Sequence, residues 1–397
     1  MRHIVSILSA LIFILAFLSP ALQAQISIDF SASTKSSSNL LQDSSSTYDA
    51  CSITSAIVDY IPLPSLKVSL SGEQTYYRET IGLSNIFGRF NVTYIPLSEI
   101  SRFSLYFAAS LNGRKYHSDF SGVDNNFGEV KLIGGFQLNP RFHIRGGLSF
   151  RSTVYINTGN DYKRDFDFIM GINAVLPMQT SFDFEAGYGR TNYLYKDANL
   201  TGDGWPLSRP DLPEPIPYDI MWIKDIADTK DDLWVLYLSP RLSRSLGRKT
   251  GLNLIYTIQN FQNYRGGFLW DISTGYLSPW ATVWEGQSAS VNIKSFAIPG
   301  LIVNTGYGHW NKRFLTTSNR YDADGLDRTY LEVKTEDKPR EDSVNRFYLS
   351  LQCPVKLNHE YLIEPVLNIE HMNNNSNKPL YNFDDYSITT GVSFRFR

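Results

Sequence analysis

Apolar and polar residues alternate along this 397-residue chain almost from end to end, and this pattern limits what the chain can fold into. In the closing segment 387–397, one parity carries Ile388, Thr390, Val392, Phe394 and Phe396. A repeat of two residues is the period of a β-strand, whose successive side chains point to opposite faces. We therefore expect two-faced strands through most of the chain.

The first residues have a different character. Met1–Ala24 opens with Arg2 and His3, runs apolar from Ile4 to Leu18 and breaks at Pro20, which predicts a secretory signal peptide. The mature chain is expected to start between Leu22 and Gln25. An uncleaved helical anchor is the alternative, but this apolar run is shorter than the roughly 20 residues that a spanning helix needs. The predicted organisation is a signal peptide at 1–24 and one domain at 25–397.

Composition bears on the kind of membrane protein that is possible. Hydrophobic residues make up 42% of the chain, the aromatic share is 14%, and the mean hydropathy is slightly negative. These values suit apolar residues that alternate rather than cluster, as in strands that cross a membrane. The formal net charge of −2 gives no reason to expect a nucleic-acid partner. The two cysteines, Cys51 and Cys353, fall on distant predicted strands, so we expect two free thiols.

Short and long linkers alternate between these segments. Short periplasmic turns and long extracellular loops have this rhythm in outer-membrane barrels. The short set is 61–65, 96–99, 139–140, 177–180, 245–249, 299–300 and 356–359, rich in Pro, Gly and Asn. The long set is 35–47, 78–84, 115–126, 157–163, 196–230, 264–283, 316–342 and 373–383. The rhythm predicts an all-β, antiparallel up-and-down barrel of about sixteen strands. The alternation is weakest at 26–34 and 284–298, so fourteen strands is the alternative.

The two faces of several strands can be assigned directly. Phe142, Ile144, Leu148 and Phe150 share the parity expected to face lipid, and Phe103, Leu105, Phe107, Phe166, Phe168 and Met170 do the same on neighbouring strands. Open sheet edges are costly in hydrocarbon, so the strands should close into a ring. A soluble sandwich or propeller would use shorter strands and would not need Phe on its outer faces. Pro365 lies inside the predicted strand 361–372, where we expect a bulge.

The opposite parity gives the candidate pore-lining residues: Arg102, Lys131, His143, Arg145, Arg151, Asp165, Asp167, Asp183 and Glu185. Counted from the turns, Arg151 should lie level with Asp165 or Asp167 and pair with it. One interpretation is a transverse field across a water-filled pore, without strong ion selectivity because both signs are present. The other is a lattice of ion pairs that stiffens the wall and has no transport role. Glycines of this parity, among them Gly135, Gly147, Gly171, Gly187, Gly189, Gly306 and Gly308, either leave room inside or relieve curvature.

Two long loops carry further signals. Segment 196–230 contains five prolines and two tryptophans, and it could cap the surface, narrow the pore or remain a disordered loop. Segment 316–342 begins a calcium-loop pattern at Asp322, but Val333 stands where a Glu is required, so a solvated loop is preferred. We predict no metal site and no cofactor.

The histidines predicted at the rim are candidates for catalytic groups. His117 adjoins Ser118, and neighbouring residues of a strand face opposite ways, which makes a poor base and nucleophile pair. The segment from His371 to Asn377 faintly resembles the His-x-Ser-Asn motif of outer-membrane phospholipase A and lipid A deacylases, but Ser376 stands five residues on instead of two. His309 precedes Trp310 and has no such context. We therefore predict no catalytic residue and no enzyme.

The last hairpin, Asn373 to Arg397, resembles the closing hairpin of many Gram-negative outer-membrane barrels, including porin-like proteins and barrels associated with polysaccharide or lipoprotein export. The resemblance implies an outer-membrane location, recognition by the barrel-insertion machinery, and contact with membrane lipid and lipopolysaccharide. Family members usually end on the aromatic residue, whereas Arg397 follows Phe396 here. The predicted function is passage of a small solute or glycan. The alternative is a barrel without conduction for export, assembly or surface interaction, or less favoured, a lipid-modifying enzyme.

Overall fold

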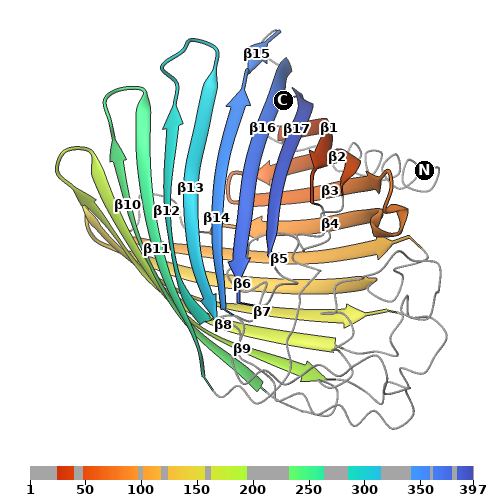
Figure 1. Ribbon diagram of the computed structural model, residues 1–397. Coiled ribbons are helices and arrows are strands. Elements are labelled where there is room, and N and C mark those ends of the chain that lie inside the picture. The colour runs from red at the N-terminus through yellow and green to blue at the C-terminus, as the bar shows by residue number, and fades with distance from the viewer. Residues whose placement is uncertain are drawn as a thin grey trace.

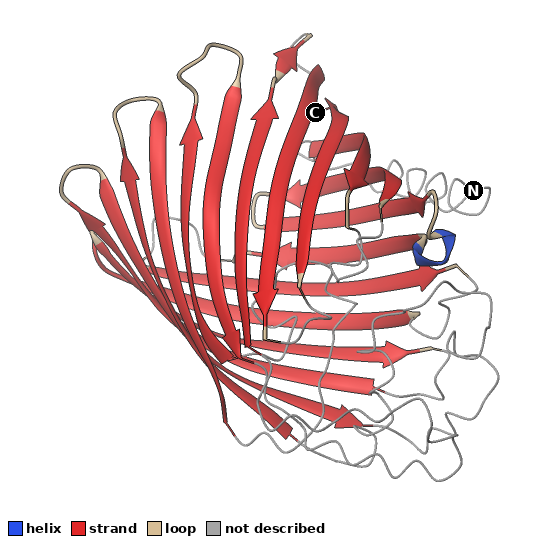
Figure 2. Ribbon diagram, in the orientation of Figure 1, coloured by secondary structure: helices blue, strands red, loops and turns tan. Residues whose placement is uncertain are grey.

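The computed structural model describes ten segments of the chain: 25–39, 48–96, 102–117, 124–156, 162–194, 232–262, 285–313, 341–357, 361–377 and 382–396. The predicted signal peptide, most of the long loops and residue Arg397 lie outside the described residues. Strands make up almost all of what is described, and one short 3-10 helix, η1 at Ile81–Leu83, lies between two of them (Figure 2). No helix in these segments is long and apolar enough to cross a membrane.

Seventeen strand segments form one sheet. They are β1 Gln25–Ser37, β2 Asp49–Leu63, β3 Leu66–Tyr77, β4 Asn85–Tyr94, β5 Phe103–Tyr116, β6 Asn125–Asn139, β7 Phe142–Tyr155, β8 Tyr162–Leu176, β9 Thr180–Leu194, β10 Asp232–Ser245, β11 Thr250–Gln262, β12 Glu285–Ser295, β13 Ile302–Arg313, β14 Glu341–Gln352, β15 Val355–Lys356, β16 Tyr361–Ser376 and β17 Phe383–Phe396.

The sheet closes on itself. Each strand pairs antiparallel with its neighbours in the sequence, except that β14 and β15 both pair with β16, and β1 pairs with β17 from Ile28↔Phe396 to Ser37↔Ser387. Figure 1 shows the first and last strands side by side, with the chain winding once around the barrel between them. Closure removes the free edges that hydrocarbon would penalise. Because β14 and β15 are two pieces of one strand, the barrel has sixteen strands, as the linker rhythm predicts.

Prolines explain the break between β14 and β15. Gln352 pairs with Val366 and Val355 pairs with Ile363, so the register does not shift across the break. Cys353 donates its backbone N–H to the Pro365 carbonyl, whereas Pro365 has no N–H to return. The pairing of β16 with β17 also runs past Pro365 without a shift. The predicted bulge is therefore wrong: the lost hydrogen bond falls at the Cys353–Pro354 interruption, and no extra residue is needed to absorb it.

The tight connections gather at one end of the barrel, which we call the turn end; the opposite end is the loop end. Gly247 and Gly300 adopt positive φ in two of these turns, where glycine is favoured. Met178 and Gln179 turn the chain between β8 and β9 with φ of 58° and 55°, although neither is a glycine. At the loop end, Asp385 accepts a hydrogen bond from Ser37 and ties the β17 start to the β1 end.

The outer face carries the residues assigned to lipid. Phe142, Ile144, Leu148 and Phe150 of β7 are each exposed by 40% to 44%. Ser149 and Thr153 of the same strand have the opposite parity, point inward and are buried. The same alternation holds on β8, where Phe166, Phe168, Met170 and Ile172 are exposed. A closed barrel whose exposed surface is a band of large apolar side chains is stable in a bilayer and not in water.

The cysteines are both free, as expected: Cys51 is buried on β2, and Cys353 is exposed at the β14 break.

Candidate pore-lining site

The candidate site is the inner face of strands β6 to β9, where the predicted charged residues gather. Alternation sends every second side chain inward, and the antiparallel register decides which of them meet. All nine predicted residues have the parity opposite to the exposed apolar set, although Arg102 stands just before β5 begins. Two clusters of charged side chains stand out on these four strands, one around Arg145 and one around Glu129.

Arg145 is the centre of the first cluster. Its guanidinium donates to both carboxylate oxygens of Asp183 at 3.0 Å and to Glu185 at 2.8 Å. Both acids lie on β9, whereas Arg145 lies on β7. The strand between β7 and β9 is β8, and its Gly171 lies opposite Arg145. A Cβ at Gly171 would lie 2.7 Å from the Arg145 Nε, so the glycine leaves the room through which Arg145 reaches β9.

Tyr237 on β10 completes this cluster. Its hydroxyl donates to Glu185 at 2.7 Å, and its ring covers Gly187, whose Cβ would stand only 2.0 Å from a ring carbon. Asn173 of β8 donates weakly to Asp183 at 3.4 Å. Four adjacent strands thus join in one hydrogen-bonded patch. At Gly171 and Gly187 the structure shows that the glycines leave room for large side chains, which was one of the two roles predicted for them.

The second cluster centres on Glu129 of β6. One of its carboxylate oxygens lies 3.0 Å from Arg151 and 3.1 Å from Lys131. The Arg151 guanidinium also lies 5.5 Å from the centroid of the Phe127 ring, within range of a cation–π contact. Glu129 is absent from the predicted set. Its parity matches that of Lys131, and counting back from the turn at Pro140 places it opposite Arg151, so the signal was present in the sequence.

The remaining predicted residues take their expected heights. Arg151 lies opposite Asp165 and Ser149 opposite Asp167 in the β7–β8 register. This confirms that Arg151 and Asp165 are level. Arg151 forms an ion pair with Glu129 on its other side, and its pairing with Asp165 or Asp167 stays a prediction. His143 lies over Gly135 of β6, whose Cβ would meet the imidazole at 2.5 Å.

Farther around the barrel, two more inward-facing arginines lie on β4 and β5. Arg89 donates to Asn112 at 2.6 Å, and both Arg89 and Arg114 lie just over 5 Å from the Phe87 ring, at 5.3 Å and 5.1 Å. These residues were not predicted, although they share the inward parity.

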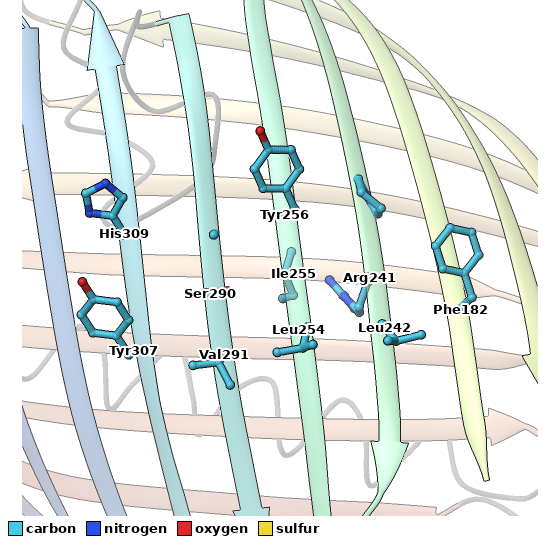
Figure 3. A pocket seen from close by; sticks show the side chains of 12 residues that line it. Phe182, Arg241, Leu242, Leu254, Ile255, Tyr256, Ser290, Val291, Tyr307 and His309 are labelled. Atoms are coloured by element: carbon cyan, nitrogen blue, oxygen red, sulfur yellow. The ribbon is translucent and has the colours of Figure 1, made fainter. Parts of the chain in front are cut away.

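A groove of about 420 Å³ lies against β9 to β13, but it belongs to the outer face (Figure 3). Leu242, Leu254, Tyr256 and Tyr307 line it and are exposed with the outward parity. Pro240, which cannot donate to the ladder, and the small Ala289 contribute to the depression. A groove with this apolar lining at this position would be filled by lipid chains, so it is not the candidate site.

The rim histidines have structural partners on the outer face. His371 contacts Asp384 at 2.5 Å and stacks on Tyr386, and His309 lies 2.9 Å from the Asn345 amide oxygen. Ser376 has the parity opposite to that of His371 and is buried. The two side chains therefore lie on opposite faces of β16. Among the described residues, no group of three or more His, Cys, Asp or Glu side chains could hold a metal ion.

No protein-family model matches the chain, and no curated protein is similar to it. The solved structures that are similar to the chain are matched at low sequence identity. The OpdK structure of Pseudomonas aeruginosa with vanillate has a TM-score of 0.47 and 10% identity, covering 94% of this chain and 98% of that one. OccD3 of the same species has a TM-score of 0.46 and 11% identity, covering 94% and 91%. CdiB of Acinetobacter baumannii has a TM-score of 0.48 and 11% identity, covering 93% and 60%.

All three TM-scores lie below 0.5, and the assignment of the fold rests on the strand pairing and on the two faces of the sheet. An antiparallel barrel of even strand number, with tight turns at one end and an exposed apolar band, has the architecture of outer-membrane proteins. The chain therefore folds as a closed antiparallel β-barrel of the outer-membrane type.

Proposed function

We propose that the barrel is a passive channel for small solutes, with a pore lined by the nine predicted residues together with Glu129 and Tyr237. The observation that carries the proposal is the polar and ionic inner face of a closed sixteen-strand barrel. A ring of that size encloses an aqueous interior unless side chains or loops fill it. Within each cluster the charged side chains lie along the wall and bond to one another. The centre of the barrel is then left for water.

The charges suggest how solutes would be handled. In the Arg145 cluster one guanidinium serves two carboxylates, and in the Glu129 cluster one carboxylate serves two cations. Counted alone, the second cluster is more positive than the first, and the carboxylates of Asp165 and Asp167 lie beside it on β8. Charges of both signs on the wall would set up a transverse field across the pore. Such a field orients dipolar solutes without strongly excluding either sign of ion.

A liposome-swelling assay tests the proposal. Vesicles containing the refolded protein should swell in isotonic arabinose and more slowly in a larger sugar such as stachyose, because a pore of fixed width discriminates by size. Empty vesicles are the control. Correctly folded barrels that admit neither sugar would overturn the channel and favour the export or assembly alternative.

Segment 196–230 lies outside the described residues, and its predicted role as a constriction is tested in the same assay. Deletion of 205–222 should speed swelling if the segment narrows the pore and leave the rate unchanged if it caps the surface.

A further inference from the structure

The inner wall of β12 to β16 differs in chemistry from the charged wall of β6 to β9. Its central residues are serines, asparagines and glycines, with two aromatic rings and one ion pair: Ser288, Ser290 and Asn292 on β12, Gly306, Gly308 and Trp310 on β13, Arg346, Tyr348 and Ser350 on β14, and Asn368 and Glu370 on β16. The register sets them side by side, with Asn292 opposite Gly306, Gly306 opposite Tyr348, and Tyr348 opposite Glu370.

The two rings lie against this wall. A Cβ on Gly306 would stand 2.6 Å from the Tyr348 ring, and a Cβ on Gly308 would stand 2.4 Å from the Trp310 ring. Each ring thus occupies space that any other residue at the glycine would take. The two glycines therefore let both rings lie close to the backbone of the wall. Both residues remain partly exposed.

Hydrogen bonds hold the polar groups in place around the rings. The Tyr348 hydroxyl donates to the Asn292 amide oxygen at 2.8 Å, which leaves the Asn292 amide N–H₂ as a donor. Arg346 and Glu370 form an ion pair: Nη2 donates a hydrogen bond to Oε2 at 2.9 Å, and Nε lies 2.8 Å from Oε1. The guanidinium lies 5.7 Å from the centre of the Tyr348 ring. Among the described residues, these contacts neutralise the charges in the centre of the wall.

This combination has a specific ligand chemistry. A neutral ligand suits the wall better than an ion, because Arg346 and Glu370 already neutralise each other's charge. Flat aromatic faces favour ligands that are apolar on one side, and amides and hydroxyls favour ligands with many hydroxyl groups. Sugar rings have both properties, since their C–H faces are apolar and their rims carry hydroxyls.

We propose that the wall formed by Trp310, Tyr348, Asn292, Arg346 and Glu370 is a binding site for a neutral oligosaccharide. This deepens the proposed channel function and rests on it. Sugar rings lie on the two aromatic faces, while Asn292 and the Arg346–Glu370 pair bond their hydroxyls. The charged wall of β6 to β9 forms the other side of the path.

The test is the interruption of ion current through single channels in a planar bilayer by maltohexaose and cellohexaose. At least one should block the current saturably, whereas a polyethylene glycol of the same hydrodynamic size should not. Trp310→Ala should weaken the block at least tenfold, which corresponds to the loss of one stacked ring. Tyr348→Phe, which keeps the ring and loses the bond to Asn292, should weaken it about threefold.

Trp234 provides a matched control, because this tryptophan has the outward parity and stacks on Tyr188. Trp234→Ala should leave the block unchanged. A channel that conducts but is blocked by neither sugar, or equally by the polyethylene glycol, would overturn the oligosaccharide site and leave the channel intact. If the barrel does not conduct, titration calorimetry in detergent separates the two ideas: Trp310-dependent binding of either sugar supports the site without the channel, and absence of binding removes both.

Discussion

Two walls of the same barrel show how much an alternating sequence leaves open. On β6 to β9 the inward positions carry acids and bases on neighbouring strands, and these groups pair within the wall. On β12 to β16 the inward positions carry amides, hydroxyls and rings held over glycines. Both walls have the same period and the same apolar outer side. Alternation therefore decides the face of a residue, while the chemistry of the inner face is free to vary around the ring.

The outer and inner faces of one wall differ most, because one meets lipid and the other faces the interior. Arginine substitutions test this difference, and we expect them to have the largest effect on the free energy of unfolding. Leu148 is 44% exposed near the middle of β7, with outward parity. Leu148→Arg should lower the free energy of unfolding by about 2 to 4 kcal/mol, because the charge would enter hydrocarbon. Denaturant unfolding in lipid vesicles measures this value.

Ser104→Arg is the matched control and should cost far less, since Ser104 is exposed with inward parity. Ser149, which the sequence suggests as an equivalent control, is unsuitable: it is only 5% exposed between Lys131 and Asp167 in the register. Equal losses at Leu148 and Ser104 would mean that the faces are assigned the wrong way round.

Glycine substitutions test whether glycines of the inner wall leave room for the large side chains beside them. In Gly187→Ala the new Cβ would fall 2.0 Å from the Tyr237 ring, so the ring must move and its bond to Glu185 must weaken. We expect a loss of about 1 to 3 kcal/mol in unfolding free energy. Gly88→Ala is the control, because no heavy atom lies within 4 Å of its Cβ position. If the contact with Tyr237 is the cause, the penalty at Gly187 should largely disappear in a Tyr237→Ala background.

Charge removal on the β6 to β9 wall should give the smallest effect. Arg145→Ala combined with Arg151→Ala leaves their carboxylate partners uncompensated. Two charges about 10 Å from a passing ion, screened over one Debye length, change its local concentration about twofold in favour of cations. Reversal potentials in a salt gradient measure this change. Asp183→Asn with Glu185→Gln should shift the potential in the opposite sense, and a shift of the same sign in both variants would contradict the assignment of these groups to the pore.

The sequence predicts the barrel well because its signals are local. Strand faces follow from parity, and the register within a hairpin can be counted from a tight turn, as with Arg151 and Asp165 across β7 and β8. Glu129 could have been found in the same way from the turn at Pro140.

Other contacts could not be counted from the sequence. Tyr237 reaches Glu185 across the pairing of β9 with β10, and the connection 195–231 between those strands hides their register. Tyr348 and Gly306 are separated in the same way by 314–340. The bulge predicted at Pro365 is wrong for another reason. The cost of the missing N–H depends on the partner strand, and that strand is already interrupted at Cys353 and Pro354.

Single-channel recording tests the central claim most directly, namely that the polar inner face of the sixteen-strand barrel encloses a continuous path of water. The refolded protein, shown to be folded by its heat-modifiable migration, should give discrete current steps whose size rises in proportion to electrolyte concentration. The steps should show little preference between potassium and chloride. Folded protein that inserts into the bilayer and passes no current, before or after deletion of 205–222, would contradict the account.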